Sequence, residues 1–214
     1  MMKTRACVVV LGVVAAATVG MTIEAAETDP VPFGAPAEVT ESTRDTDTYG
    51  DTSNPWTGEN RMRGNIFSVT QVTTVEQIAQ YLDIPADTTL LFSVCRKTND
   101  GSVTGLYTRD FLADVAVTAA GAAFYSSGTI SYSLDPAYYY YICAGWDIGA
   151  NITYYRGNQA VPLATAFGAL ETGVPAGGDG NPSTYNNTYT GFSPYYMRLT
   201  FTIVPVELQT FTIE

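Results

Sequence analysis

The chain has 214 residues, a formal net charge of −11 and no histidine. Nucleic acid and anionic membrane surfaces both require a cationic face, so neither is an expected partner. The lack of histidine excludes Ser-His-Asp and Cys-His catalysis and every His-ligated zinc site. With 14% charged residues, 15 tyrosines and 19 glycines, the composition is typical of a β-sandwich rather than a helical bundle.

Residues 1–26 have the layout of a secretory signal peptide. Lys3 and Arg5 precede an apolar run, and small residues follow it near the candidate cleavage points. We therefore expect a secreted protein, periplasmic or extracellular, with no membrane span once the signal is cleaved. The uncharged residues 6–23 are also long enough to act as an uncleaved anchor, which is the alternative.

The next stretch, residues 27–62, is predicted to be a disordered acidic linker. Between residues 27 and 60 there are eight acids against Arg44 alone, with few aliphatic side chains and no sustained period. Such a segment buries too little apolar surface to offset the entropy of ordering its backbone. It is either a spacer or a plain leader, and composition does not separate the two.

The folded domain is predicted to span residues 63–206, followed by a C-terminal tail at 207–214. Period-2 alternation of apolar and polar residues indicates strands, and turn signals such as Asn99-Asp100-Gly101 and Asp135-Pro136 separate them. The predicted strands cover residues 65–73, 88–97, 104–118, 129–134, 138–146, 151–155 and 196–205.

Two segments of this domain are harder to interpret. Residues 74–84 fit both a helical stripe with a capping box and strand parity, and strand is the prediction. Residues 157–195 are dense in Gly, Pro, Asn and Ser and are predicted to be a long loop, of the kind that is usually functional or mobile. Together the elements predict an all-β, antiparallel two-sheet sandwich, jelly-roll-like, with about eight strands.

One block of the domain resembles a known class of modules. It contains Tyr125-Ser126-Ser127-Gly128, then Ile130-x-Tyr132-x-Leu134, then an aromatic strand from Tyr138 to Gly145-Trp146. This layout is similar to bacterial secreted jelly-roll, galactose-binding-like accessory modules. The resemblance implies a jelly-roll fold and attachment to a carbohydrate.

Two cysteines, Cys95 and Cys143, lie on predicted strands of the domain. An exported chain meets an oxidising compartment, so a disulfide between them is the prediction. The alternative is a pair of buried free thiols.

Aromatic residues are the predicted ligand-binding residues, because flat rings stack on sugar rings. We expect Trp146, Tyr154, Tyr155, Tyr185 and Tyr189 to bind the ligand. Asn181, Asn186 and Asn187 could add polar partners for sugar hydroxyls, as in small-molecule sites generally. The alternative is that tyrosine serves only as a good strand residue and that Trp146 lies in the core.

The predicted function is therefore that of a non-catalytic binding or surface-interaction module, whose partner is a carbohydrate or another cell-surface component. One alternative is a glycoside hydrolase that uses paired carboxylates among Asp110, Asp114 and Asp147. Another is a structural protein of an envelope or matrix. No cofactor is expected, although Asp179-Gly180-Asn181 carries oxygen atoms of the kind that calcium takes.

Overall fold

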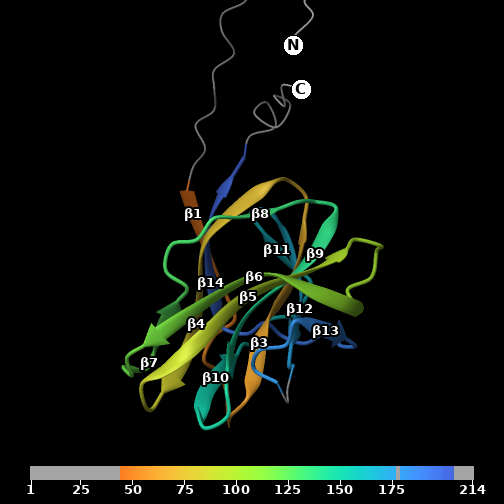
Figure 1. Cartoon of the computed structure of the whole chain (residues 1–214). Helices are drawn as coiled ribbons and strands as arrows, with labels where there is room; N and C mark the ends of the chain where they lie inside the picture. Colours follow the sequence, from red (N-terminus) through yellow and green to blue (C-terminus); the bar gives the residue numbers. More distant parts are fainter. Residues whose placement is uncertain (1–43, 177–178, 205–214) are drawn as a thin grey trace, which may run out of the picture. The chain divides into compact units, whose positions relative to one another are not determined.

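The computed structural model describes residues 44–176 and 179–204, which form 14 β-strands (Figure 1). The strands make two antiparallel sheets of seven, so the predicted all-β, two-sheet architecture is confirmed. The predicted signal peptide, the linker up to residue 43 and the C-terminal tail lie outside the described residues. None of the described residues belongs to a helix long and apolar enough to cross a bilayer.

Sheet A is built around one long strand, β4. Strands β14 and β10 pair along one edge of β4, and strands β8 and β7 pair along the other. Strand β1 extends the sheet beyond β14, and strand β2 extends it beyond β10. The members of sheet A are β1 (Arg44–Tyr49), β2 (Asn54–Gly58), β4 (Thr73–Ile84), β7 (Gly121–Ser126), β8 (Tyr132–Leu134), β10 (Ile152–Arg156) and β14 (Met197–Ile203).

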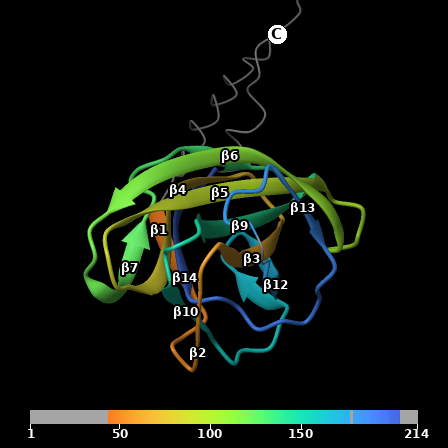
Figure 2. The same ribbon diagram turned by 60° about the horizontal axis from the view of Figure 1, so that its bottom comes forward.

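Sheet B has the strand order β11-β12-β3-β9-β5-β6-β13. Its longest strands, β5 and β6, run side by side as a curved hairpin (Figure 2). The members of sheet B are β3 (Arg61–Val69), β5 (Thr88–Thr98), β6 (Gly105–Val117), β9 (Tyr138–Trp146), β11 (Leu163–Thr165), β12 (Gly168–Val174) and β13 (Thr184–Asn187).

Strand β9 is buried on both of its faces. Tyr140 and Ile142 contribute to the main core, which also takes buried side chains from sheet A. Tyr139, Tyr141 and Cys143 point the other way, into a second apolar cluster that includes Val174 of β12 and side chains of β3 and β6. The second cluster therefore covers the face of β9 that points away from the main core.

Several local predictions are confirmed. Residues 74–84 lie in strand β4 rather than in a helix. Gly101 has φ +82° in the turn between β5 and β6, as the Asn99-Asp100-Gly101 signal predicts. On β14, Met197, Leu199 and Phe201 are all fully buried, as the clean alternation of that segment predicts.

Other predictions are corrected by the structure. The sandwich begins no later than Arg44, because β1 and β2 occupy part of the predicted linker. These edge strands are held by backbone pairing with β14 and β10, and most of their side chains are exposed, so composition does not reveal them. The predicted loop 157–195 contains β11, β12 and β13, and the described strands number 14 rather than about eight.

The predicted disulfide is not formed in the structure, where Cys95 and Cys143 are free, buried thiols. The register pairs Cys95 with Tyr141 and Ser93 with Cys143, so the two cysteines are diagonal neighbours rather than direct partners. A disulfide needs Cβ atoms about 3.5–4.5 Å apart, closer than the diagonal spacing of roughly 7 Å. A hydrogen bond with Cys143 lowers the pKa of the Cys95 thiol, and burial raises the pKa of Cys143.

Candidate functional site: an aromatic pocket beside Arg156

One hollow of the described structure combines aromatic walls with a single cation. Its volume is about 350 Å³, within the usual range for small-molecule sites. No carboxylate contributes to its wall. The residues that line this aromatic pocket are Trp56, Tyr154, Arg156, Pro175, Phe192 and Tyr195.

The pairing of β2 with β10 builds one wall of the pocket. Trp56 lies directly opposite Tyr154 in the register, so both side chains project from the same face of sheet A. Because β2 is an edge strand, Trp56 stays 56% exposed. The ring of Tyr154 is buried and packs 5.7 Å from the ring of Trp146 and 6.0 Å from that of Tyr195, so the wall is rigid where it meets the core.

Two buried polar residues of β3 support the pocket, Asn65 on the side of Tyr195 and Arg63 on the side of Tyr154. The amide of Asn65 accepts a hydrogen bond from Tyr195 N at 2.8 Å and donates one to Tyr195 O at 3.1 Å. Arg63 donates to the hydroxyl of Tyr154 at 3.0 Å, and its guanidinium lies 4.6 Å from the centre of that ring. Asn65 thus holds the backbone of Tyr195 in place, and Arg63 holds the ring of Tyr154.

The opposite wall is a coil segment, residues 192–195, anchored to β12. Gly173 N donates to Phe192 O at 2.8 Å, and Phe192 N donates to the Thr172 hydroxyl at 3.1 Å. A Cβ atom at Gly173 would lie 2.3 Å from Ser193 O, so only glycine permits this approach. The segment can approach β12 this closely because residue 173 is a glycine, which has no side chain.

Arg156 is the polar element of the pocket. It is half-buried, and its guanidinium lies 5.5 Å from the centre of the Phe192 ring. Its Nε is buried and has no hydrogen-bond partner among the described residues, and no ion pair within them includes Arg156. Burial raises the pKa of Tyr195 to about 12, although the nearby Arg63 and Arg156 act to lower it.

The predicted ligand-binding residues divide between this pocket and other places. Tyr154 lines the pocket, and Tyr189 borders it, with its ring 5.2 Å from that of Phe192. Trp146 is fully buried in the main core, where its indole donates to Gly58 O at 2.8 Å, so the alternative of a core tryptophan holds. Tyr185 packs on the second cluster, and Tyr155 lies on the other face of sheet A from Tyr154.

Of the polar loop residues predicted beside these rings, Asn181 and Asn187 already have partners. Asn187 is buried and donates to Val103 O and Tyr189 O, at 2.8 and 3.0 Å. The Asn181 side chain accepts from Arg109, and Asn186 is exposed on β13. Asp179 accepts a hydrogen bond from Asn181 N at 2.8 Å, and the described residues contain no group of three acidic or cysteine side chains placed to hold a metal ion.

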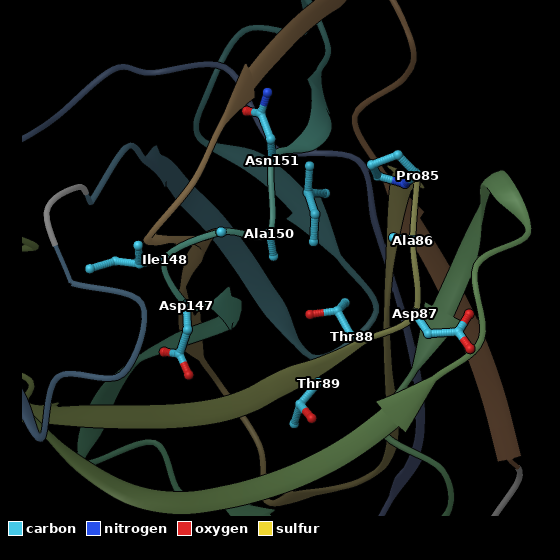
Figure 3. Close-up of a pocket in the computed structure, with 11 residues that line it drawn as sticks. Pro85, Ala86, Asp87, Thr88, Thr89, Asp147, Ile148, Ala150 and Asn151 are labelled. Carbon is cyan, nitrogen blue, oxygen red and sulfur yellow. The ribbon is translucent and has the colours of Figure 1, made fainter.

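A second hollow, of about 330 Å³, lies between the β4–β5 and β9–β10 loops. Figure 3 shows Asp147 on one side of it and Asp87 on the other, with the Asp87 carboxylate pointing away from Asp147. Asp87 accepts a hydrogen bond from Ala119 N at 2.8 Å. The two acids therefore do not converge on a shared point in this hollow.

A third hollow, of about 410 Å³, lies along β5 and β6 and carries charged residues that are already paired. Arg96 lies 3.4 Å from the carboxylate of Asp110, and Lys97 lies 2.5 Å from that of Asp100. Asp110 also accepts from the Tyr132 hydroxyl at 2.7 Å. These mutual contacts leave little bonding capacity for a ligand.

The three acids of the hydrolase alternative are dispersed. Asp147 and Asp110 line different hollows, and Asp114 is exposed on β6. Asp110 and Asp114 are four residues apart on one strand, about 13 Å along it. Glycosidase carboxylates are separated by about 5–9.5 Å, so these two do not have that geometry.

Sequence reasoning missed Trp56, Arg156 and Phe192. Trp56 fell in the predicted linker, and nothing in the local sequence links it to Phe192, which is 136 residues away. No protein-family model, curated protein or solved structure matches this chain. The site therefore has to be interpreted from its own geometry.

Proposed function

We propose that this chain is an exported, non-catalytic binding module that holds a saccharide in the aromatic pocket. The observation that carries the proposal is Trp56, a largely exposed tryptophan on an edge strand, which lies beside Tyr154 on one wall of a hollow with mainly apolar lining. Tryptophan and tyrosine are enriched at binding surfaces, because each combines a large apolar ring with a polar group. The sequence resemblance to jelly-roll accessory modules favours the same ligand class.

The rigidity of the pocket supports binding rather than chemistry. Its walls are fixed by Asn65, Arg63 and Gly173, so little ordering is required of them when a ligand enters. No carboxylate lines it, and a hydrolase would need two at a defined separation. A sugar can use both parts of the site, because its apolar face stacks on a ring and its hydroxyls accept hydrogen bonds from a guanidinium.

A glycan array probed with the full chain tests this proposal. We expect retention of at least one saccharide class, and at least tenfold weaker retention by Trp56→Ala, a loss of about 1.4 kcal/mol. Stability should change little, since surface substitutions usually stay within about 0.5 kcal/mol. If no saccharide is retained above background, the proposed ligand class is wrong.

Leu106→Ala is the matched control. Leu106 is 58% exposed, close to the value for Trp56, but it lines the hollow along β5 and β6. Retention by this variant should equal that of the native chain. If Leu106→Ala loses retention while Trp56→Ala keeps it, the binding site is the other hollow.

A further inference from the structure

The aromatic pocket contains a positive charge without a counter-charge. Three ion pairs occur among the described residues, and they involve Arg44, Arg96 and Lys97. Arg156 takes part in none of them, although acids outnumber bases 21 to 10 in the whole chain. Because Arg156 has no carboxylate partner among the described residues, its guanidinium is available to pair with an external anion.

The surroundings of Arg156 provide few hydrogen-bond partners for its guanidinium. Its Nε is buried and has no acceptor among the described residues, and a buried donor without a partner costs roughly 1–3 kcal/mol. The ring of Phe192, 5.5 Å away, compensates only in part, since cation–π contacts contribute about 0.5–2 kcal/mol. A carboxylate bound in the pocket would neutralise the charge of the guanidinium and so offset part of this cost.

A second cation acts in the same region. Arg63 is 5% exposed, stacks behind the ring of Tyr154 and has its own Nε without a partner. The two hydrogen bonds that its side chain makes within the described residues go to neutral oxygens, Met62 O and the Tyr154 hydroxyl, which leave its charge uncompensated. Both arginines lower the pKa of Tyr195 on the pocket wall, which is the effect of a positive field at that point.

The shape of the charged group suggests the kind of anion. A guanidinium is planar and presents two parallel N–H donors, a geometry that matches a carboxylate in a bidentate pair. The pocket holds a group of sugar size beside this fork, with Trp56 available for stacking. A sugar ring that carries its own carboxylate uses both features at once.

We propose that the aromatic pocket selects acidic saccharides, with a uronic acid ring against Trp56 and its carboxylate paired with Arg156. This inference rests on the proposed saccharide binding and specifies its substrate class. Neutral sugars keep the stacking contact but leave the guanidinium unpaired. The site should therefore discriminate by charge more than by ring shape.

The test uses oligomers of glucuronic, galacturonic and mannuronic acid, each paired with its methyl ester, in titration calorimetry with the full chain. The ester keeps the ring and removes the charge. We expect at least one acid to bind tenfold or more tightly than its ester. Arg156→Gln should bind that acid and its ester equally, and Arg156→Lys should keep part of the preference because it keeps the charge.

Arg198→Gln is the matched control, since Arg198 also lies over an aromatic ring, 4.1 Å from the centre of Phe124, but outside the pocket lining. It should keep the preference for the acid. Equal binding of acid and ester by the native chain would overturn the acidic ligand while leaving saccharide binding intact. A preference that survives Arg156→Gln in a folded variant would overturn the role of Arg156, and binding of neither probe alongside an empty glycan array would overturn the proposed function itself.

Discussion

Two groups of contacting aromatic rings lie on opposite faces of sheet A, and they differ in what the rings touch. In the aromatic pocket, Trp56 has a largely exposed ring and Arg156 has an unsatisfied donor. The second group, which we call the outer tetrad, has rings that pack mainly on each other. It consists of Tyr81, Phe124, Tyr155 and Tyr196.

The outer tetrad is centred on Tyr81 of β4. The centre of its ring lies 5.2 Å from that of Phe124, 5.3 Å from that of Tyr155 and 4.8 Å from that of Tyr196. The guanidinium of Arg198 lies over the ring of Phe124, 4.1 Å from its centre. The four rings pack against one another. We therefore interpret the tetrad as side-chain packing on the outer face of sheet A, and not as a binding site.

The difference teaches that aromatic content alone does not identify a site. Both groups are rich in tyrosine, and strand alternation divides neighbours between them, since Tyr154 faces the pocket and Tyr155 the tetrad. The two groups differ in the interactions that they leave unmade. In the pocket, the Nε of Arg156 has no acceptor among the described residues, whereas in the tetrad the rings contact one another. Variants of each group should therefore affect binding and stability differently.

The largest expected effect comes from the residue that holds the pocket wall. Asn65→Ala leaves the N–H and the carbonyl of Tyr195 without their partner in a buried place, which should lower the free energy of unfolding by about 4 kcal/mol. Saccharide binding should weaken as well, because Tyr195 loses the two hydrogen bonds that hold it in the pocket wall. Urea titration measures the first effect and calorimetry the second.

Asn65→Asp is the control for this prediction. A carboxylate can accept from Tyr195 N but cannot donate to Tyr195 O, and it adds a charge to a buried place. Its unfolding free energy should also fall well below that of the native chain. If both variants unfold as the native chain does and bind equally well, Asn65 does not support the pocket.

The second-largest expected effect is a loss of folding stability at alkaline pH. Burial raises the pKa of Tyr195 from its usual value near 10 to about 12, so the folded state holds this proton more tightly than the unfolded chain does. The stabilisation is fully present below pH 10 and is lost as the pH rises to 12. Its size is on the order of 2–3 kcal/mol, from about 1.4 kcal/mol for each pH unit.

Tyr195→Phe isolates this contribution. Other buried tyrosines, such as Tyr141, also have raised pKa values, but they titrate in both proteins. Unfolding free energies measured at pH 9 and at pH 11.5 should therefore fall less for Tyr195→Phe than for the native chain. If the unfolding free energy falls by the same amount between pH 9 and pH 11.5 in both proteins, the pKa of Tyr195 is the same in the folded and the unfolded chain.

Much of the fold could be predicted because the long strands carry their information locally. On β14, alternating apolar side chains indicate a buried face without reference to any partner. Strands β1 and β2 contain no such pattern, since they are stabilised by backbone pairing with distant strands. The predicted linker therefore extended too far, into residues that belong to the sheet.

The candidate site was less predictable for a related reason. Tyr154 and Tyr155 are consecutive on a strand, so alternation already implied that they could not share one site. Trp56 and Phe192 reach the pocket only through the register of β2 with β10 and the approach of a coil segment to Gly173, and local sequence does not encode either. A lone arginine such as Arg156 resembles a solvated surface residue until its missing partner is known.

The smallest of the three effects tests the outer tetrad directly. Tyr81→Ala removes three ring contacts, each contributing about 0.5–1.5 kcal/mol, and should lower the free energy of unfolding by about 2 kcal/mol. Saccharide binding should stay at the native level, because the tetrad and the pocket lie on opposite faces of the sheet. Tyr81→Phe, which keeps the ring and loses only a 3.4 Å hydrogen bond to Ala122 O, should cost less than about 0.5 kcal/mol. If Tyr81→Ala instead stays as stable as the native chain but loses saccharide binding, the tetrad is the binding surface and the assignment of the two aromatic groups must be exchanged.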